Sequence, residues 1–330
     1  MKNVLHNRYT LTKKLGSGTH GISYLAFDEQ EKQDVVIKRL RQELTPENRK
    51  KWPKESRMLQ RLAHPQIPKF IDFFEAEVEL ELLPHLVQEY IPGQNLLEVM
   101  KQKAITPQEC IQHVISILEI LVYLQSVSPP VVHRDIKPEN IILHAENQKL
   151  YLIDFGISTT MQGQTFGHTM AAGTLGYQSK EQIEGDPGLA SDVYSLGVVA
   201  VLWMSGRTIE DLHVGLGKIK WREYLPHCPP QILDFLEKML HPSTRNRYKN
   251  AKDALLGAKR SLEPSSQRVS KNKTQKTPVK NKRMPFINKG TENKERISSE
   301  GYALLFGLLV GGTILIKSFF FPSLVDWENG

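Results

Sequence analysis

Short runs of alternating apolar and polar residues open this 330-residue chain. Residues 8–18 (RYTLTKKLGSG), 22–29 (ISYLAFDE) and 34–40 (DVVIKRL) are rich in strand-forming residues and are separated by turn-forming ones, which is typical of β-strands. We therefore expect a β-rich region at the N-terminus.

Helical spacing replaces this pattern in the middle of the chain. Thr106 followed by Pro107 predicts a helix N-cap with proline at the first helical position. In residues 107–126 the apolar side chains are spaced for one helix face: Ile111, Val114, Ile115, Leu118 and Val122. Residues 191–206 (SDVYSLGVVAVLWMSG) are apolar on most faces, which predicts a helix buried on all sides.

Residues 264–300 have a different composition. They contain ten Lys and Arg against three Glu, which accounts for the +7 net charge of the whole chain, so the rest of the chain is neutral. Large apolar side chains are scarce here, and such a segment cannot bury enough surface to fold alone. We expect a disordered basic juxtamembrane linker.

Residues 301–325 are strongly apolar. Tyr302–Ile316 carries no charge, and Lys317 is the only charged residue before Asp326. About 20 apolar residues cross a bilayer, a length that is reached if Lys317 extends toward the headgroups. We expect a transmembrane helix; the alternative is a buried C-terminal helix or a pair of strands.

The flanks of this segment predict its orientation. The basic linker lies on its N-terminal side, so the positive-inside rule places the large domain in the cytoplasm. Residues 326–330 would then be a short extracytoplasmic tail, and the protein would cross the cell membrane once. Gly307 and Gly311 have the spacing that can seat a second membrane helix.

The overall composition and the cysteine and histidine content exclude few classes of protein. A hydrophobic content of 40% with 24% charged residues is ordinary for a globular protein. Two cysteines, Cys110 and Cys228, exclude a disulfide framework and fit a reducing compartment. The histidines show no spacing typical of metal ligands.

A glycine-rich turn lies between the first two predicted strands. Gly16, Gly18 and Gly21 form a G-x-G-x-x-G pattern, which alone could open a nucleotide-binding helix or be a flexible turn. The strand-like residues that follow favour a hairpin, whose backbone N–H groups can approach phosphates without obstruction. Lys38, in the apolar run that comes next, can hold phosphate oxygens; the alternative is an ordinary solvated strand end.

A second set of polar residues follows two later apolar runs. Asp135 and Asn140 are five residues apart with Lys137 between them, and Asp154 ends the run YLID. A carboxylate that can accept a hydroxyl proton, an amide oxygen and a second carboxylate make the oxygen-rich environment that Mg²⁺ prefers.

These motifs together resemble those of protein kinases. The glycine-rich turn, Val-Val-Ile-Lys38, His133-Arg134-Asp135 through Asn140, and Asp154-Phe155-Gly156 follow that family's order over roughly residues 8–260. The resemblance implies an α+β, bilobal protein-kinase fold over residues 1–263, with a β-rich N-lobe to about residue 91 and a helical C-lobe over 92–263. The order of domain, basic linker and membrane span resembles bacterial Hanks-type (eukaryotic-like) serine/threonine protein kinases.

The resemblance also implies the catalytic residues. Asp135 would accept the substrate hydroxyl proton, with Lys137 and Thr174 beside it as in serine/threonine kinases. Lys38 would hold ATP phosphates and pair with Glu55. The metal, Mg²⁺ with Mn²⁺ as an alternative, would bind to Asn140 and Asp154. The implied ATP-binding positions are Leu15, Gly16, Ser17, Gly18, Gly21, Ser23, Lys38, Gln88, Glu89, Ile91 and Asn95.

Regulatory and structural roles follow from the same resemblance. Arg134 implies control by activation-loop autophosphorylation, because an arginine there can bind a phosphate. The loop offers Thr159, Thr160, Thr165 and Thr169 as sites; Thr165 and Thr169 are the leading candidates, and we favour Thr169. Glu181 would form a buried ion pair with Arg247, with Arg245 as the rival partner, and Asp192 would also be structural.

Three positions depart from the family pattern. Ser23 stands where valine is usual, His20 where an aromatic residue is common, and Lys180 where the Ala-Pro-Glu motif has proline. None is expected to contact a phosphate, the metal or the transferred proton, so we expect an active enzyme. The alternative is a pseudokinase scaffold that recruits partners at the membrane or DNA.

The expected partners follow from this domain order. They are cytoplasmic protein substrates, the membrane, and a second copy of the chain for autophosphorylation in trans. Residues 264–300 would bind anionic lipid or, without sequence preference, DNA.

Overall fold

The computed structural model describes residues 4–18, 21–40, 59–78, 81–155, 159–160, 174, 176–215 and 218–264. The chain divides into two units, Met1–Thr274 and Gln275–Gly330, and every described residue lies in the first. Glu55, Thr165, Thr169, the linker beyond residue 264 and the predicted membrane span all lie outside the described residues.

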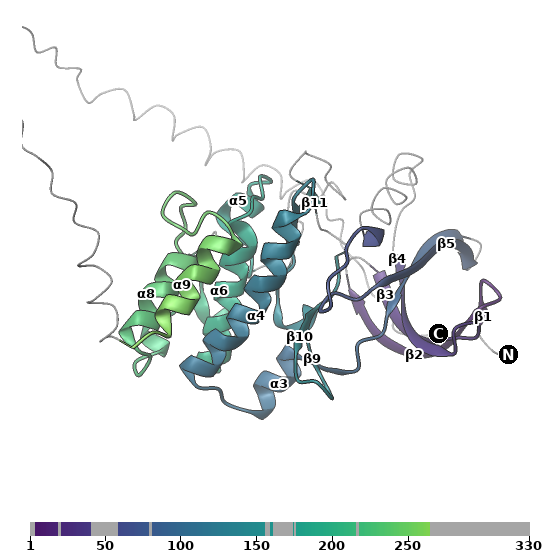
Figure 1. Cartoon of the computed structure of the whole chain (residues 1–330), viewed down its shortest axis with the longest axis horizontal. Helices are drawn as coiled ribbons and strands as arrows, with labels where there is room; N and C mark the ends of the chain where they lie inside the picture. Colours follow the sequence, from purple (N-terminus) through teal and green to yellow (C-terminus); the bar gives the residue numbers. More distant parts are fainter. Residues whose placement is uncertain are drawn as a thin grey trace, which may run out of the picture. The chain divides into compact units, whose positions relative to one another are not determined.

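A six-stranded antiparallel sheet forms the N-terminal part, with the strand order β1-β2-β3-β4-β6-β5 (Figure 1). Tyr9, Ile37 and Phe74 belong to a small core that this sheet buries. The strands expected over residues 8–40 are confirmed. The six strands are β1 (Val4–Leu5), β2 (Tyr9–Gly18), β3 (Gly21–Asp28), β4 (Gln33–Leu40), β5 (Phe70–Val78) and β6 (Glu81–Glu89).

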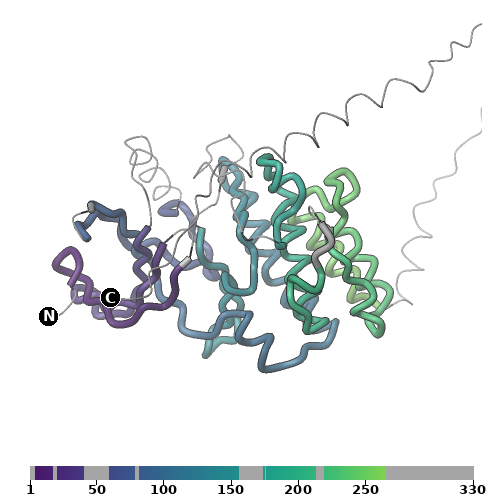
Figure 2. The backbone as a smooth tube through the Cα atoms, turned by 180° about the vertical axis from the view of Figure 1, so that it is seen from behind, coloured from purple at the N-terminus to yellow at the C-terminus, as the bar shows by residue number. Residues whose placement is uncertain are grey.

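Helices dominate the second part, which Figure 2 shows from behind. The longer ones are α4 (Pro107–Ser126), α6 (Ser191–Ser205), α8 (Pro230–Met239) and α9 (Ala251–Ser261), which share a large hydrophobic core. Every residue of α6 from Ser191 to Trp203 is buried. This confirms the helix predicted to be buried on all sides, and it ends at Gly206 in a left-handed conformation (φ 64°).

The structure confirms α4 and its N-cap, and it buries more of the helix than the face predicted from the sequence. Thr106 Oγ1 accepts a hydrogen bond from the Glu109 N–H, and the Glu109 carboxylate accepts one from the Thr106 N–H. Ile115 and Val122, expected on the buried face, are only partly buried. Both α6 and α9 pack against α4, so residues outside the predicted face are buried too: Cys110, Ile117, Ile120, Leu121 and Leu124.

Short elements lie between the large ones. The three-stranded sheet β10-β9-β7 consists of β7 (Gly93–Asn95), β9 (Ile141–His144) and β10 (Leu150–Leu152). Two strand pairs are β8 (Val131–Val132) with β11 (Thr159–Thr160), and β12 (His213–Gly215) with β13 (Lys218–Ile219). The short helices are α3 (Leu96–Gln102), η1 (Pro138–Asn140), α5 (Lys180–Ile183), α7 (Ile209–Leu212) and η2 (Arg222–Tyr224).

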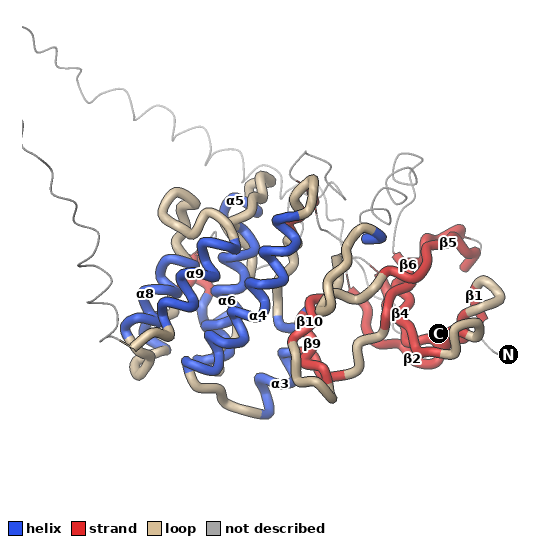
Figure 3. The backbone as a smooth tube through the Cα atoms, in the orientation of Figure 1, coloured by secondary structure: helices blue, strands red, loops and turns tan. Residues whose placement is uncertain are grey.

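The six-stranded sheet and the long helices thus occupy different regions, as Figure 3 shows by colour, while short strands also lie among the helices. The β-rich N-lobe and helical C-lobe expected from the sequence are present. In the part of the chain that the structure describes, no helix combines the length and apolar character needed to cross a membrane.

Candidate active site

A cleft of about 690 Å³ lies between the N-lobe sheet and the C-lobe. Gly18, one of the predicted ATP-binding residues, pairs with Gly21 at the end of the β2–β3 hairpin. The other predicted ATP-binding residues all line this cleft: Leu15, Gly16, Ser17, Gly21, Ser23, Lys38, Gln88, Glu89, Ile91 and Asn95.

The roof of the cleft is the hairpin and the strand beside it. A Cβ atom at Gly21 would overlap the carbonyl oxygen of Arg39 on β4, so this close strand pairing requires glycine. Ser23 and Lys38 are directly opposite each other in the β3–β4 register. Cross-strand neighbours lie on the same face of a sheet, so both reach the cleft.

Lys38 joins the roof to the C-lobe. Its side chain is buried, and its Nζ donates a hydrogen bond to Asp154 Oδ1. Asp154 has a positive φ of 64°, a conformation that costs a non-glycine residue about 1–3 kcal/mol and persists only when its surroundings hold it. The structure therefore brings the predicted phosphate-binding lysine and a predicted metal ligand into direct contact.

Asp135 is a buried carboxylate surrounded by donors. The Thr174 N–H and Oγ1 donate to Oδ1 at 3.2 and 3.0 Å. Asn140 Nδ2 donates to Oδ2 at 2.8 Å, and Lys137 Nζ lies 2.9 Å from the same oxygen. Lys137 also donates to Thr174 Oγ1 at 2.7 Å. These contacts fix the position of the Asp135 carboxylate in the cleft.

The loop that carries Asp135 is held from beneath by α6. The two carboxylate oxygens of Asp192 accept hydrogen bonds from the His133 and Arg134 N–H groups, each at 2.8 Å. His133 Nδ1 accepts from the Asp135 N–H at 3.3 Å, so the ring proton lies on Nε2, which donates to the Ile153 carbonyl at 3.1 Å. Burial lowers the pKa of His133, which agrees with a neutral ring.

Arg134 has a buried guanidinium. Its Nε and Nη1 have no hydrogen-bond partner among the described residues, and burial lowers its pKa. Its backbone carbonyl accepts a bond from Gln182 Nε2 at 2.6 Å, which ties the loop to α5. Buried N–H donors on a cation suit an anionic ligand.

The predicted metal ligands border the same cleft. Asn140 and Asp154 both line it, and the Asn140 amide nitrogen bonds to Asp135, which leaves its Oδ1 as the oxygen that can face a cation. The described residues contain no group of three or more His, Cys, Asp or Glu side chains that could hold a metal. An amide and a carboxylate fit Mg²⁺, which keeps waters and substrate phosphates as further ligands.

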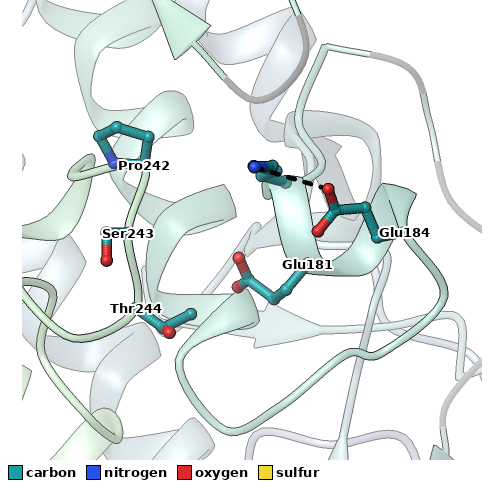
Figure 4. Close-up of a pocket in the computed structure, with 6 residues that line it drawn as sticks. Glu181, Glu184, Pro242, Ser243 and Thr244 are labelled. Atoms are coloured by element: carbon teal, nitrogen blue, oxygen red, sulfur yellow. Dashed lines mark ion pairs between the residues drawn. The ribbon is translucent and has the colours of Figure 1, made fainter. Parts of the chain in front are cut away.

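Glu181 and Arg247 form the expected ion pair, whereas the rival Arg245 is exposed. Arg247 donates from Nη1 and Nη2 to the two carboxylate oxygens at 2.6 and 3.3 Å. Its remaining bonds go to the carbonyls of Ala190, His241 and Pro242. Glu181 lies beside a smaller cavity of about 340 Å³. Figure 4 shows its lining, with Glu184 just after the end of α5 and Pro242, Ser243 and Thr244 on the facing turn.

Sequence reasoning missed several residues of the main cleft. Val36 lies two positions before Lys38 on β4 and so shares its face, a signal that strand periodicity could have supplied. Ile142 and Ile153 also line the cleft. Asn95 lines it too, but its Oδ1 accepts a bond from the Glu98 N–H as the N-cap of α3, so a ribose contact would use its amide nitrogen.

Comparison with known proteins agrees with this geometry. Residues 9–256 match the protein kinase domain family. Serine/threonine-protein kinase B of Synechocystis sp. is 33% identical over 271 residues, which cover 76% of this chain and 46% of that protein. Serine/threonine-protein kinase PknA of Nostoc sp. is 30% identical over 273 residues, 77% of this chain and 47% of that protein.

Serine/threonine-protein kinase PknB of Mycobacterium leprae is 35% identical over 208 residues, 61% of this chain and 33% of that protein. The chain thus spans about half the length of the two cyanobacterial relatives and about a third of the mycobacterial one. On this evidence the chain belongs to the protein kinase family and is similar to its bacterial serine/threonine members.

Proposed function

We propose that this chain is an active serine/threonine protein kinase that transfers the ATP γ-phosphate to hydroxyl groups of cytoplasmic proteins. The observation that carries the proposal is the convergence of Lys38, Asp135, Asn140 and Asp154 on one cleft between two lobes. Membership of the family implies ATP and a divalent metal, generally Mg²⁺; Mn²⁺ is the alternative that we propose.

Each residue of the cleft has a proposed role that follows from its position. Asp135 would orient the substrate hydroxyl and accept its proton, while Lys137 and Thr174 hold that carboxylate in place. Lys38 would contact ATP phosphates while its bond to Asp154 keeps the two lobes in register. A bound metal ion would neutralise phosphate charge. Catalysis in such a site depends mainly on positioning and electrostatic stabilisation.

Phosphate transfer from labelled ATP to a mixture of serine- and threonine-containing proteins tests this proposal. The wild-type chain should label them with Mg²⁺, and Asp135→Asn should not. Nucleotide binding measured in parallel identifies the alternative, because a pseudokinase scaffold would bind ATP and transfer nothing.

Activation-loop phosphorylation is the regulation that we propose. Arg134 supports it, because its buried guanidinium has donors without partners among the described residues. A phosphothreonine at Thr169, or at Thr165, would supply the missing acceptors. Preincubation with ATP should raise the initial rate of the wild type, but not that of Thr169→Ala or Arg134→Met. Equal rates with and without preincubation would contradict this regulation.

We also propose that residues 301–325 anchor the chain in the cell membrane and that residues 264–300 bind anionic lipid or DNA. The support is the uncharged run Tyr302–Ile316 and the basic composition before it. Fractionation of the full chain, and of a variant ending at residue 300, tests the anchor. Binding of that variant is then measured separately with anionic vesicles and with duplex DNA, each at rising salt, to show which of the two ligands the linker binds.

We also propose that phosphate is transferred between two copies of the chain. Self-phosphorylation whose rate rises with protein concentration would support this transfer.

A further inference from the structure

The turn before α5 has no room for a side chain at Gly176. This residue has a positive φ of 93°, and a Cβ atom there would overlap Cγ1 of Ile209 and lie 3.2 Å from its Cδ1. Ile209 is the first residue of α7 and is partly buried against the C-lobe core. Its side chain therefore fills the space beside the Gly176 backbone.

α7 is itself held firmly. Just before it, the Thr208 N–H and Oγ1 donate to Asp211 Oδ2 within the helix at 2.9 and 3.2 Å. At its other end, Leu212 is fully buried and its carbonyl accepts a bond from the Lys220 N–H at 2.8 Å. Ile209 is thus attached to a fixed support.

A second observation places α7 at the same turn. Burial raises the pKa of Tyr177, and the nearby carboxylates of Glu139 and Glu210 raise it further. Glu210 follows Ile209 in α7, so this helix approaches the turn at both Gly176 and Tyr177.

This turn carries the residue that holds Asp135. The Tyr177 N–H donates to the Thr174 carbonyl at 3.3 Å, and the Thr174 N–H and Oγ1 donate to Asp135. Asp192, near the start of α6, holds the same loop, because its carboxylate accepts bonds from the His133 and Arg134 N–H groups. α7 follows α6 after a short connection, so two consecutive helices contact the segments that carry Asp135 and Thr174.

We propose that Ile209 is a positioning residue for phosphate transfer: it fixes Gly176 and thereby keeps Thr174 on the Asp135 carboxylate. This inference rests on the proposed kinase activity. Loss of the contact lets the turn move, so the rate of transfer falls while ATP binding persists. This positioning role falls on a residue of α7, which lies outside the sequence motifs that identify the active site.

A double-mutant cycle on the full chain tests the contact. Ile209→Ala should lower kcat for a peptide substrate about 10-fold, because small misplacements of reacting groups slow transfer, with the KM for ATP unchanged. Gly176→Ala should lower it more, about 100-fold, since the new methyl group meets Ile209 Cγ1 and the positive φ strains any side chain there. Gly176→Ala combined with Ile209→Ala should be faster than Gly176→Ala alone, because the overlap is gone, but slower than the wild type, because the backbone strain remains.

Two matched variants separate positioning from stability. Ile209→Val keeps the Cγ1 position and should retain wild-type kcat. Ile115→Ala truncates another partly buried isoleucine that packs on the same core, in α4, and should lower the melting temperature without lowering kcat. Unchanged kcat in Ile209→Ala, or effects of the two substitutions that simply multiply, would overturn the inference.

The failure of the proposed activity is distinguishable from the failure of this inference. If the wild-type chain transfers no phosphate, the melting temperatures of the wild type, the two single variants and the double variant are compared instead. Gly176→Ala should then be partly restored by Ile209→Ala, and additive losses of melting temperature would overturn the contact.

Discussion

Two ion pairs start from neighbouring residues of α5 and differ in almost every respect. Glu181 pairs with Arg247 at 2.6 Å, and the Arg247 side chain is 0% exposed. Lys180 pairs with Glu184 at 3.6 Å, and both of those side chains are more than half exposed. The family motif has proline at the position of Lys180 and glutamate at that of Glu181. The departure from the motif therefore falls on the exposed pair.

The energies of the two pairs differ as much as their burial. An exposed ion pair contributes about 0–1 kcal/mol, whereas removal of one partner from a buried pair costs about 3–5 kcal/mol. Arg247 also donates to three backbone carbonyls and lies over the Tyr194 ring at 4.9 Å. Glu181 and Arg247 thus anchor α5, and Lys180 does not.

Arg247→Met should have the largest effect on stability. It should lower the free energy of unfolding by about 3–5 kcal/mol, because Glu181 is left largely buried without its partner. Urea unfolding followed by tryptophan fluorescence measures it. The matched control is Arg245→Met, an exposed arginine in the same turn, which should change stability by less than about 0.5 kcal/mol. Equal losses in the two variants would contradict the assignment of the pair.

The contribution of the buried Glu181–Arg247 pair to the free energy of unfolding should depend on pH, an effect smaller than that of Arg247→Met. Burial alone would raise the pKa of Glu181, but its hydrogen bonds, led by those from Arg247, together with the charge of Arg247 outweigh burial and leave that pKa below its usual value of 4.5. Stabilisation by this carboxylate is therefore complete above about pH 4.5 and disappears as the pH falls through the lower folded-state pKa. Unfolding free energies of the wild type and Glu181→Gln should differ by a constant amount at pH 6–8 and converge in acid. A gap that widens in acid would contradict this sign.

Lys180→Pro should have the smallest effect. Lys180 is the first residue of α5, where proline is tolerated, and Ser179 before it already has φ −71° and ψ 160°, a conformation that precedes proline well. The exposed pair with Glu184 is lost at little cost, so stability should change by less than about 1 kcal/mol. Phosphate transfer by this variant should equal that of the wild type. A tenfold loss or gain would show that the exposed position matters.

Much of this site could be predicted from local sequence. Asp135, Lys137 and Asn140 lie within six residues of one another on one loop, so their meeting depends little on distant packing. The helix over residues 191–206 was predictable because its apolar residues cover every side. The strands around Lys38 were predictable because short runs rich in strand-forming residues lie between turn-forming ones.

Contacts between distant segments were harder to predict without the family resemblance. Lys38 and Asp154 are 116 positions apart, and nothing in the local pattern of either predicts their ion pair. The choice of Arg247 over Arg245 depends on which side of a turn faces α5. Ile209 and Gly176 are an ordinary apolar residue and an ordinary glycine until the fold brings them together. Such contacts are set by tertiary packing, which residue spacing does not record.

Phosphate transfer by the cleft that contains Asp135 can be measured in a single comparison. Residues 1–300 should be given labelled ATP and Mg²⁺ with a protein substrate, beside the same chain carrying Asp135→Asn. Nucleotide binding should be equal in the two chains. Label on serine and threonine with the wild type alone is the result predicted here. Nucleotide binding by both chains without label from either would contradict it and favour a scaffold.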